Sequence, residues 1–201
     1  MLLYDKDPSA PILDNKFGIT DEEVFRAIES DFAQQRTYEL LLRPFVITAE
    51  NFEDAFCETH RYMFQDVYDW AGTYRDVMIS KEGSNFSRPE DISRDMHELV
   101  QVVKENNYCD GKGYDLSTIA FRIAHISDAL NYIHPFREGN GRAKHIFLQM
   151  YALTIGYILD YSKISEEALL RAEISANHSV TNEISVLVDL HRRCLSKDMG
   201  E

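Results

Sequence analysis

The sequence predicts a single, mostly α-helical domain with one β-hairpin. Apolar residues recur every three or four positions along most of the chain, which is the spacing of amphipathic helices. Only residues 76–88 resemble paired strands, because residues that favour strands flank a cluster of turn-forming residues. The 201 residues include nine glycines and five prolines, are 44% hydrophobic, and contain no internal repeat or convincing linker. We therefore expect one well-buried domain over residues 1–201.

The N-terminal third is predicted to contain an extended arm and two helices. Residues 1–16 carry two prolines and form the arm. A capping box begins at Thr20, so the first helix starts there and runs to about Leu42. The second helix covers about residues 49–70, and Gly72 follows as the kind of residue that commonly terminates a helix.

The predicted hairpin precedes the remaining helices. Val77 and Ile79 favour strand, residues 82–85 form a turn cluster, and Phe86 begins the returning apolar side. Helices are then expected after Pro89 and over about residues 116–133, 140–157, 165–176 and 182–195.

The densest group of reactive side chains lies between two of these helices, in residues 133–142. The helix before it should end near His134, because Pro135 disfavours a helical conformation in the preceding residue. The next helix begins at the glycines on the far side of the segment. Residues 116–157 are thus predicted to form a helix–loop–helix with the reactive side chains on the loop.

This loop combines an anion site, a metal ligand and a base. The amides at a helix N-terminus attract anions, and Gly139-Asn140-Gly141 lets a phosphate approach them closely. Asn140 adds a side-chain amide, and Arg142 can hold two phosphate oxygens at once. The carboxylate of Glu138 suits Mg²⁺ that is otherwise held by phosphates and water. His134 accepts a proton near neutral pH, so the loop suggests transfer from a nucleotide onto a hydroxyl.

Residues 134–142 match the pattern His-Pro-Phe-x-[Asp/Glu]-Gly-Asn-Gly-Arg at every fixed position. This pattern is the signature of Fic domains, which the sequence therefore resembles. Residues 15–19 and the run from His60 to Arg75 resemble the same family, in the order that the family has them. The resemblance covers nearly the whole chain and implies the Fic fold, a helical domain whose β-hairpin flap lies over the active site.

The resemblance implies a protein adenylyltransferase that transfers AMP from ATP to a Ser, Thr or Tyr hydroxyl of a target protein. By that analogy His134 is the general base, Glu138 holds Mg²⁺ between the α- and β-phosphates, and Arg142 neutralises the outer phosphates. Gly139-Asn140-Gly141 lines the anion hole, and Phe136 points into the core and positions the loop. The cofactors implied are ATP, as co-substrate, and Mg²⁺.

In Fic domains the flap holds the target segment by strand addition, and this aligns the target hydroxyl with the motif histidine. The resemblance assigns this role to residues 77–87. The expected target contacts are Ile79, Lys81 and Phe86.

Two comparisons with the family pattern concern phosphate binding and regulation. Many members carry arginine three residues after the motif arginine, where this chain has His145. This histidine either weakens the grip on the γ-phosphate or simply packs. Many members are also inhibited by a helix with Ser/Thr-x-x-x-Glu-Gly/Asn, whose glutamate pairs with the motif arginine. No complete copy occurs here, so the chain resembles the class that is inhibited by a separate small antitoxin.

Charge and cysteine content restrict the class of partner and compartment. A net charge of −13 argues against nucleic acid or an anionic membrane as the main partner, although Arg137, Arg142 and Lys144 make the motif locally positive. The three cysteines lie far apart without a C-x-x-C, as in reduced thiols of a cytoplasmic protein. No signal-peptide core or run of membrane-spanning length is found, and the oligomeric state stays unassigned.

Other activities remain as alternatives. A kinase-type branch of the family has Ala-Asn-Lys-Arg in place of the residues 139–142 found here, so it is disfavoured. Transfer from another nucleotide and removal of AMP from targets both stay open. A catalytically silent nucleotide-binding module is less consistent with an intact His134 and Glu138. A metal-dependent phosphohydrolase would need more metal ligands than this loop provides.

Overall fold

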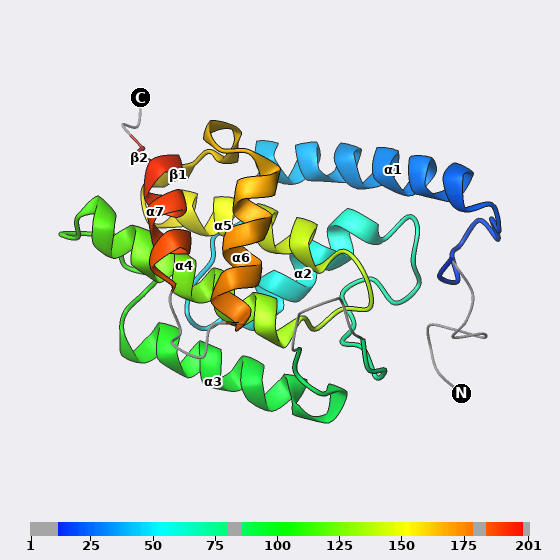
Figure 1. The fold of residues 1–201 in the computed structure, drawn as a ribbon, viewed down its shortest axis with the longest axis horizontal. Coiled ribbons are helices and arrows are strands. Elements are labelled where there is room, and N and C mark those ends of the chain that lie inside the picture. Colours follow the sequence, from blue (N-terminus) through cyan, green and yellow to red (C-terminus); the bar gives the residue numbers. More distant parts are fainter. Residues whose placement is uncertain (1–11, 80–85, 179–183, 199–201) are drawn as a thin grey trace.

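The computed structural model describes residues 12–79, 86–178 and 184–198, and the chain there is mostly helical (Figure 1). Its α-helices are α1 (Glu22–Leu42), α2 (Phe52–Phe64), α3 (Ile92–Glu105), α4 (Leu116–Ile133), α5 (Asn140–Thr154), α6 (Glu166–His178) and α7 (Ser185–Cys194). The remaining elements in the described residues are the 3₁₀ turns η1 (Pro89–Asp91) and η2 (Tyr161–Lys163) and the strands β1 (Tyr157–Leu159) and β2 (Leu195–Lys197).

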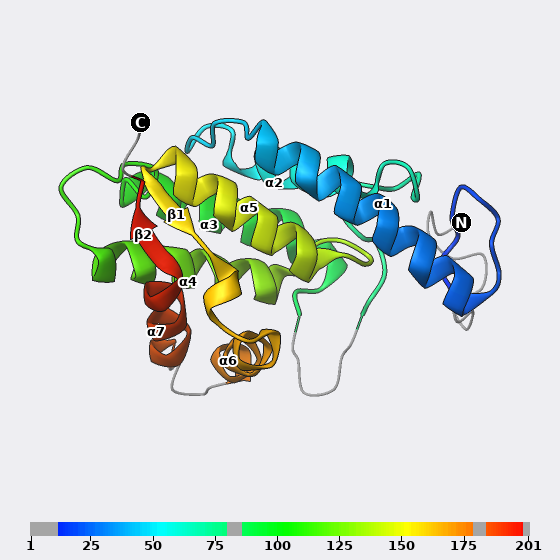
Figure 2. The same cartoon turned by 90° about the horizontal axis from the view of Figure 1, so that it is seen from above.

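Helices α4 and α5 form the centre of the molecule. Figure 2 shows α1 and α2 on one side of this pair and α6 and α7 on the other. The main apolar core contains residues from all five helices α1, α2, α3, α4 and α5. A smaller apolar cluster lies between α4, α6 and α7. The loop between α4 and α5 carries the reactive residues, so both of its ends are anchored in the core.

The apolar stripe predicted for α4 is confirmed. It is formed by the buried side chains of Ile119, Ile123, Ile126, Leu130 and Ile133. Burying each such side chain stabilises a fold by about 1.5–3 kcal/mol, so the position of the helix end at Ile133 is strongly determined. The predicted bounds of this helix agree with the observed ones.

Three predicted helix ends need correction. Helix α5 ends at Thr154 rather than at Tyr157, which lies in β1. Helix α1 is capped by Asp21 rather than Thr20, because the Asp21 carboxylate accepts a hydrogen bond from the Val24 amide, 3.0 Å away. Helix α2 ends at Phe64, not near residue 70. The chain then turns, which stacks the rings of Tyr68 and Trp70 at a centroid distance of 4.2 Å.

The strand pair is not where the sequence predicted it. Strands β1 and β2 pair antiparallel, with Ile158 opposite Ser196, and they are separated in sequence by α6 and α7. The described residues of the segment 76–88 contain no strand, and residues 80–85 lie outside the described part. The physical reason is that the arms of this segment bond to other groups. Arg75 Nη1 donates to the Val77 carbonyl and Arg75 Nη2 to the Ser87 carbonyl, and the Ser87 amide donates to the Tyr132 carbonyl.

The three cysteines are free thiols, as predicted. Burial raises the pKa of Cys57 and of Cys109 to about 11, so both stay protonated near neutral pH. In the described part of the chain, no helix is both long and apolar enough to cross a membrane. Most of the predicted arm, residues 1–11, lies outside the described residues.

Candidate active site

His134 directly follows α4 and has an unusual backbone conformation. Its φ of 45° and ψ of 57° place it in the left-handed region, which is uncommon for a residue with a side chain. Its amide still donates to the Leu130 carbonyl at 3.0 Å, so the residue caps the helix. Such strain persists only where the surroundings impose it, and it is concentrated at functional sites.

The orientation of the His134 ring is set by two neighbours. Nδ1 lies 3.2 Å from the carbonyl oxygen of Asn131, and the ring stacks on Phe86 at a centroid distance of 3.9 Å. A carbonyl can only accept a hydrogen bond, so the neutral ring carries its proton on Nδ1. Nε2 is then the basic nitrogen, as a general base requires.

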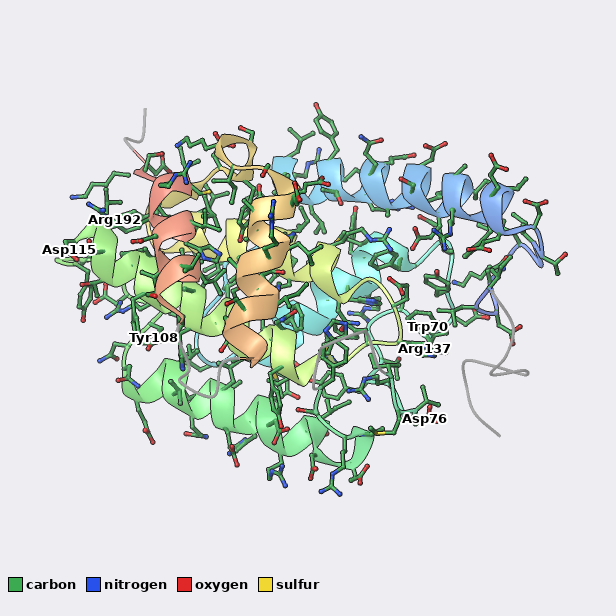
Figure 3. The ribbon with its side chains drawn as sticks, in the orientation of Figure 1. Trp70, Asp76, Tyr108, Asp115, Arg137 and Arg192 are labelled. Carbon is green, nitrogen blue, oxygen red and sulfur yellow. The ribbon has the colours of Figure 1, made fainter. Side chains whose placement is uncertain are left out.

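Arg75 holds the backbone around His134. Its side chain is buried, and its Nε donates to the His134 carbonyl at 2.8 Å. Its amide also donates to the Pro135 carbonyl at 2.7 Å. The same guanidinium binds the carbonyls of Val77 and Ser87, so one side chain joins the motif loop to both arms of the predicted flap. Burial, with a smaller effect of Arg137, lowers the pKa of Arg75 from its usual value. Figure 3 shows Arg137 and Asp76 on the same side of the molecule.

The loop after His134 is closed by Asn140. The Asn140 side chain accepts a hydrogen bond from the Phe136 amide at 2.8 Å and donates one to the Phe136 carbonyl at 2.7 Å. Phe136 is fully buried, which confirms its predicted position in the core. The side-chain amide predicted to bind phosphate therefore shapes the loop in this structure, and its role toward a nucleotide stays a prediction.

His60 packs against the motif loop and holds it by a hydrogen bond. Its ring is buried and stacks on Phe136 at a centroid distance of 3.9 Å. Nδ1 accepts a hydrogen bond from the Gly72 amide at 2.9 Å, so the ring proton sits on Nε2, which donates to the Glu138 carbonyl at 2.9 Å. Burial lowers the pKa of His60 to about 3, so the ring is neutral at physiological pH.

The two glycines of the motif differ in what the fold requires of them. Gly139 has a φ of 80° and lies against α2, where an added Cβ would come within 2.5 Å of the Phe64 ring. A Cβ on Gly141 would meet no atom within 4 Å. Packing therefore requires glycine at residue 139, whereas at residue 141 the absence of a side chain leaves the first turn of α5 accessible.

Glu138 and Arg142 line a cavity of about 380 Å³ together with Phe25, Glu29 and Tyr68. Nη2 of Arg142 is 3.8 Å from Oε1 of Glu138. The terminal nitrogens of Arg142 both bond to the Glu29 carboxylate, at 2.7 Å each. Glu29 is buried on α1 and was not among the predicted site residues.

The Glu138 carboxylate has a geometry that suits a shared cation. Its side chain is 46% exposed, and Oε1 accepts a hydrogen bond from the Gly139 amide at 2.9 Å. Within the described residues, no cluster of three or more acidic, histidine or cysteine side chains could hold a metal by itself. A single carboxylate fits Mg²⁺ that takes its other ligands from phosphates and water.

His145 points away from this cavity. Its Nε2 lies 3.0 Å from the Glu173 carboxylate on α6, and its ring contacts Tyr161. Of the two roles considered for His145, packing is the one seen here. A second cavity, of about 550 Å³, lies near Asp54, Arg61 and Gly72, and the motif residues do not line it.

The residues predicted on the flap are only partly described. Ile79 and Phe86 are half-buried, and Phe86 stacks on His134. Lys81 lies outside the described residues. Their role in target binding stays a prediction.

Three positioning residues were not found from the sequence, namely His60, Arg75 and Glu29. His60 and Arg75 act on backbone carbonyls that lie far away in the sequence, such as Glu138 for His60 and His134 for Arg75. Local patterns carry no signal for such contacts. His60 and Arg75 are the first and last residues of the run that resembles the Fic family. Their place in this run is the one sequence signal for their importance.

The Fic/DOC family matches residues 50–152. The chain belongs to the Fic/DOC family. The match includes α2, α4 and most of α5, and with them the whole motif loop.

Several Fic proteins are similar over almost the whole chain. The protein adenylyltransferase VbhT of Bartonella schoenbuchensis is 30% identical over 90% of this chain, which spans 37% of that protein. The probable protein adenylyltransferase Fic of Salmonella typhimurium is 27% identical over 94% of this chain and 90% of its own. The structure of BepC from Bartonella tribocorum with bound AMPPNP has a TM-score of 0.81 at 21% identity and covers 94% of this chain and 95% of its own. This likeness confirms the Fic fold.

Proposed function

We propose that this protein transfers AMP from ATP to a Ser, Thr or Tyr hydroxyl of a target protein. The observation that carries the proposal is the state of the motif loop. His134, in the tautomer of a general base, is on the same anchored loop as Glu138. This loop leads into the accessible first turn of α5, which carries Arg142. Relatives that bear the name protein adenylyltransferase, and a structural neighbour with bound AMPPNP, support a nucleotide substrate.

The reaction assigns one task to each residue. The target hydroxyl oxygen forms a bond to the α-phosphorus while its proton passes to Nε2 of His134. The bond between the α-phosphorus and the bridging oxygen breaks, and pyrophosphate leaves. The amides of the first turn of α5 stabilise the charge that develops on the phosphate oxygens, and Arg142 binds the outer phosphates.

Mg²⁺ fits the donors of this site. The Glu138 carboxylate would hold it together with the phosphates, and the cation would neutralise charge on the leaving pyrophosphate. The carboxylate stays in place because the Gly139 amide binds it and because His60 holds the Glu138 carbonyl.

The partners follow from the same proposal. The target segment would lie along the segment 77–87, where Phe86 already covers His134. An inhibitor would be a separate small antitoxin, because the complete inhibitory pattern is absent from the sequence. Neither nucleic acid nor a membrane is proposed as a partner, given the net charge of −13.

The test is the intact mass of the purified protein after incubation with Mg²⁺ and ATP, alone and with candidate targets. We expect a gain of one AMP unit on the protein or on a target. His134→Ala should reduce the rate by about 10²–10⁴-fold, because it removes the base. A gain of one phosphate would instead indicate kinase-type transfer.

His97→Ala is the matched control. His97 is exposed on α3, and its ring contacts Gln101. This variant should retain the wild-type rate. Equal activity of His134→Ala and His97→Ala would refute the proposed role of His134. Absence of any transfer to a panel of cell proteins, by a protein that binds ATP, would refute the proposed function.

A further inference from the structure

We propose that Glu29 is a positioning residue that holds the guanidinium of Arg142 in the orientation required to bind the outer phosphates of ATP. The inference rests on the proposed function and concerns the same site. No sequence pattern marks Glu29, which lies 113 positions before Arg142.

The contact between the two side chains is bidentate. Nη1 of Arg142 bonds to one carboxylate oxygen of Glu29 and Nη2 bonds to the other, each at 2.7 Å. This end-on arrangement fixes both the position and the plane of the guanidinium. The Phe64 ring, 4.8 Å from the guanidinium carbon, supports one of its faces.

One edge of the guanidinium lies outside the contact with Glu29. A guanidinium has five N–H groups, and the Glu29 carboxylate uses one on each terminal nitrogen. Nε and the second hydrogen of Nη2 form a further edge that can bind two oxygens. Nη2 is also the nitrogen near Glu138, the predicted ligand of the Mg²⁺ that ATP would carry. Glu29 therefore leaves the edge formed by Nε and Nη2 for the outer phosphates.

Glu29 itself is well anchored. Its side chain is buried on α1, a helix that packs against α2. Tyr68 lies beside it, and burial together with the negative charge of Glu29 raises the pKa of the Tyr68 phenol. A carboxylate on a packed helix makes a rigid support. Without it, Arg142 would lose conformational entropy when it bound phosphate.

The alternative role for Glu29 is inhibition, and it predicts tighter ATP binding when the carboxylate is removed. If the Glu29 carboxylate occupied the place of a phosphate, it would compete with ATP, as an inhibitory glutamate does. The cavity of about 380 Å³ beside both side chains provides room for phosphates without displacement of Glu29. The positioning role is therefore the one that we adopt.

The experiment is a double-mutant cycle on nucleotide binding. The Kd of Mg²⁺–ATP and of AMP is measured by calorimetry for wild type, Glu29→Gln, Arg142→Ala and the double variant. We expect Glu29→Gln to weaken ATP binding by roughly tenfold, because one charge-assisted contact no longer orients the arginine. AMP binding should be unchanged, because AMP lacks the outer phosphates. In the Arg142→Ala background, Glu29→Gln should have no further effect.

Glu39→Gln is the matched control, because Glu39 lies on the same helix and pairs with Arg36 rather than with the motif. Its Kd should equal that of wild type, and circular dichroism should show all variants folded. Tighter ATP binding by Glu29→Gln would overturn the inference in favour of competition, and additive losses in the double variant would also overturn it. A wild type that binds ATP but transfers nothing refutes only the proposed function. A wild type that does not bind ATP refutes both.

Discussion

Helix α5 carries two pairs of a cation and a glutamate on its first two turns, and they differ in exposure. Arg142 is 42% exposed and pairs with Glu29 of α1, which is 10% exposed. Lys144 is 2% exposed and pairs with Glu173 of α6, which is 7% exposed, at 2.9 Å. The first pair borders a cavity, whereas the second is enclosed between α4, α5 and α6.

Because of this difference in exposure, we assign the Arg142 pair to ligand binding and the Lys144 pair to the stability of the fold. An exposed edge of Arg142 can still interact with a ligand, so its pair prepares a binding site. Burial alone would raise the pKa of Glu173, but Lys144 and His145 together lower it to about 2, so the enclosed carboxylate stays charged. The Lys144 pair also approaches the site indirectly. The Lys144 ammonium lies 3.4 Å from the side-chain oxygen of Asn131, and the backbone carbonyl of Asn131 orients the His134 ring.

Breaking the enclosed pair should have the largest effect. Lys144→Met removes the lysine cation from the buried Glu173 carboxylate and leaves His145 as its neighbour. We expect a loss of about 3–5 kcal/mol in the free energy of unfolding. Urea denaturation measures it. The double replacement Lys144→Met with Glu173→Leu should be less destabilising than Lys144→Met alone, because no buried charge remains.

An exposed pair on α6, the helix that carries Glu173, provides the control. Arg171 and Glu167 lie on α6 with side chains 71% and 74% exposed. Arg171→Ala should cost less than about 1 kcal/mol. If Arg171→Ala and Lys144→Met cost the same, burial would not distinguish the two pairs and our interpretation of Lys144 would be wrong.

The two motif glycines provide the next largest effect. Gly139→Ala should destabilise the protein by about 1–3 kcal/mol from backbone strain, and more if the Phe64 ring cannot move away. Gly141→Ala should leave stability nearly unchanged, because its Cβ meets no atom within 4 Å, but it should weaken ATP binding. Thermal unfolding and ATP titration of both variants test this contrast. Equal losses of stability would show that residue 141 is constrained by the fold.

The remaining contrast concerns two buried histidines, one on each side of the core. Burial lowers the pKa of His60, beneath the motif loop, to about 3, and that of His191, beside α6, to about 4. The unfolded chain takes up these protons near pH 6.5, whereas the folded chain does not. Stability is therefore complete above pH 6.5 and falls as the pH decreases toward 4, by about 1.4 kcal/mol per pH unit for each histidine.

Urea denaturation between pH 7.5 and 4.5 measures that slope. His191→Gln should reduce the slope by the contribution of one proton. Any change in packing caused by the substitution shifts the free energy of unfolding equally at every pH, so it does not alter the slope. A slope that is the same in His191→Gln and wild type would show that His191 is already protonated in the folded protein.

Much of the fold could be predicted from periodicity. Helix α4 was predicted with its observed bounds, because five buried residues repeat on one face and Pro135 follows. The strands could not be predicted, because β1 and β2 have three residues each and alternation cannot be recognised over so short a length. The end of α2 at Phe64 was also missed, because Tyr68 and Trp70 are apolar whether they continue the helix or fold back onto its core.

The candidate site was predictable only where its residues are contiguous. The motif placed His134, Glu138 and Arg142 on one loop, and the structure shows Glu138 and Arg142 at one cavity. The sequence did not predict that the Asn140 side chain closes the loop onto Phe136, and its role toward a phosphate stays a prediction. The supports supplied by His60, Arg75 and Glu29 come from elements distant in sequence.

The sequence by itself determined the helical domain, the position of the reactive loop and the chemical groups that the loop carries. These depend on local spacing, on Pro135, and on a contiguous run of residues. Only the tertiary structure decided the contact of Arg75 with the His134 carbonyl, the requirement for glycine at residue 139, and the pairing of Arg142 with Glu29. Each of these arises when two distant segments pack together, and packing brings into contact groups whose separation in sequence carries no signal of their proximity.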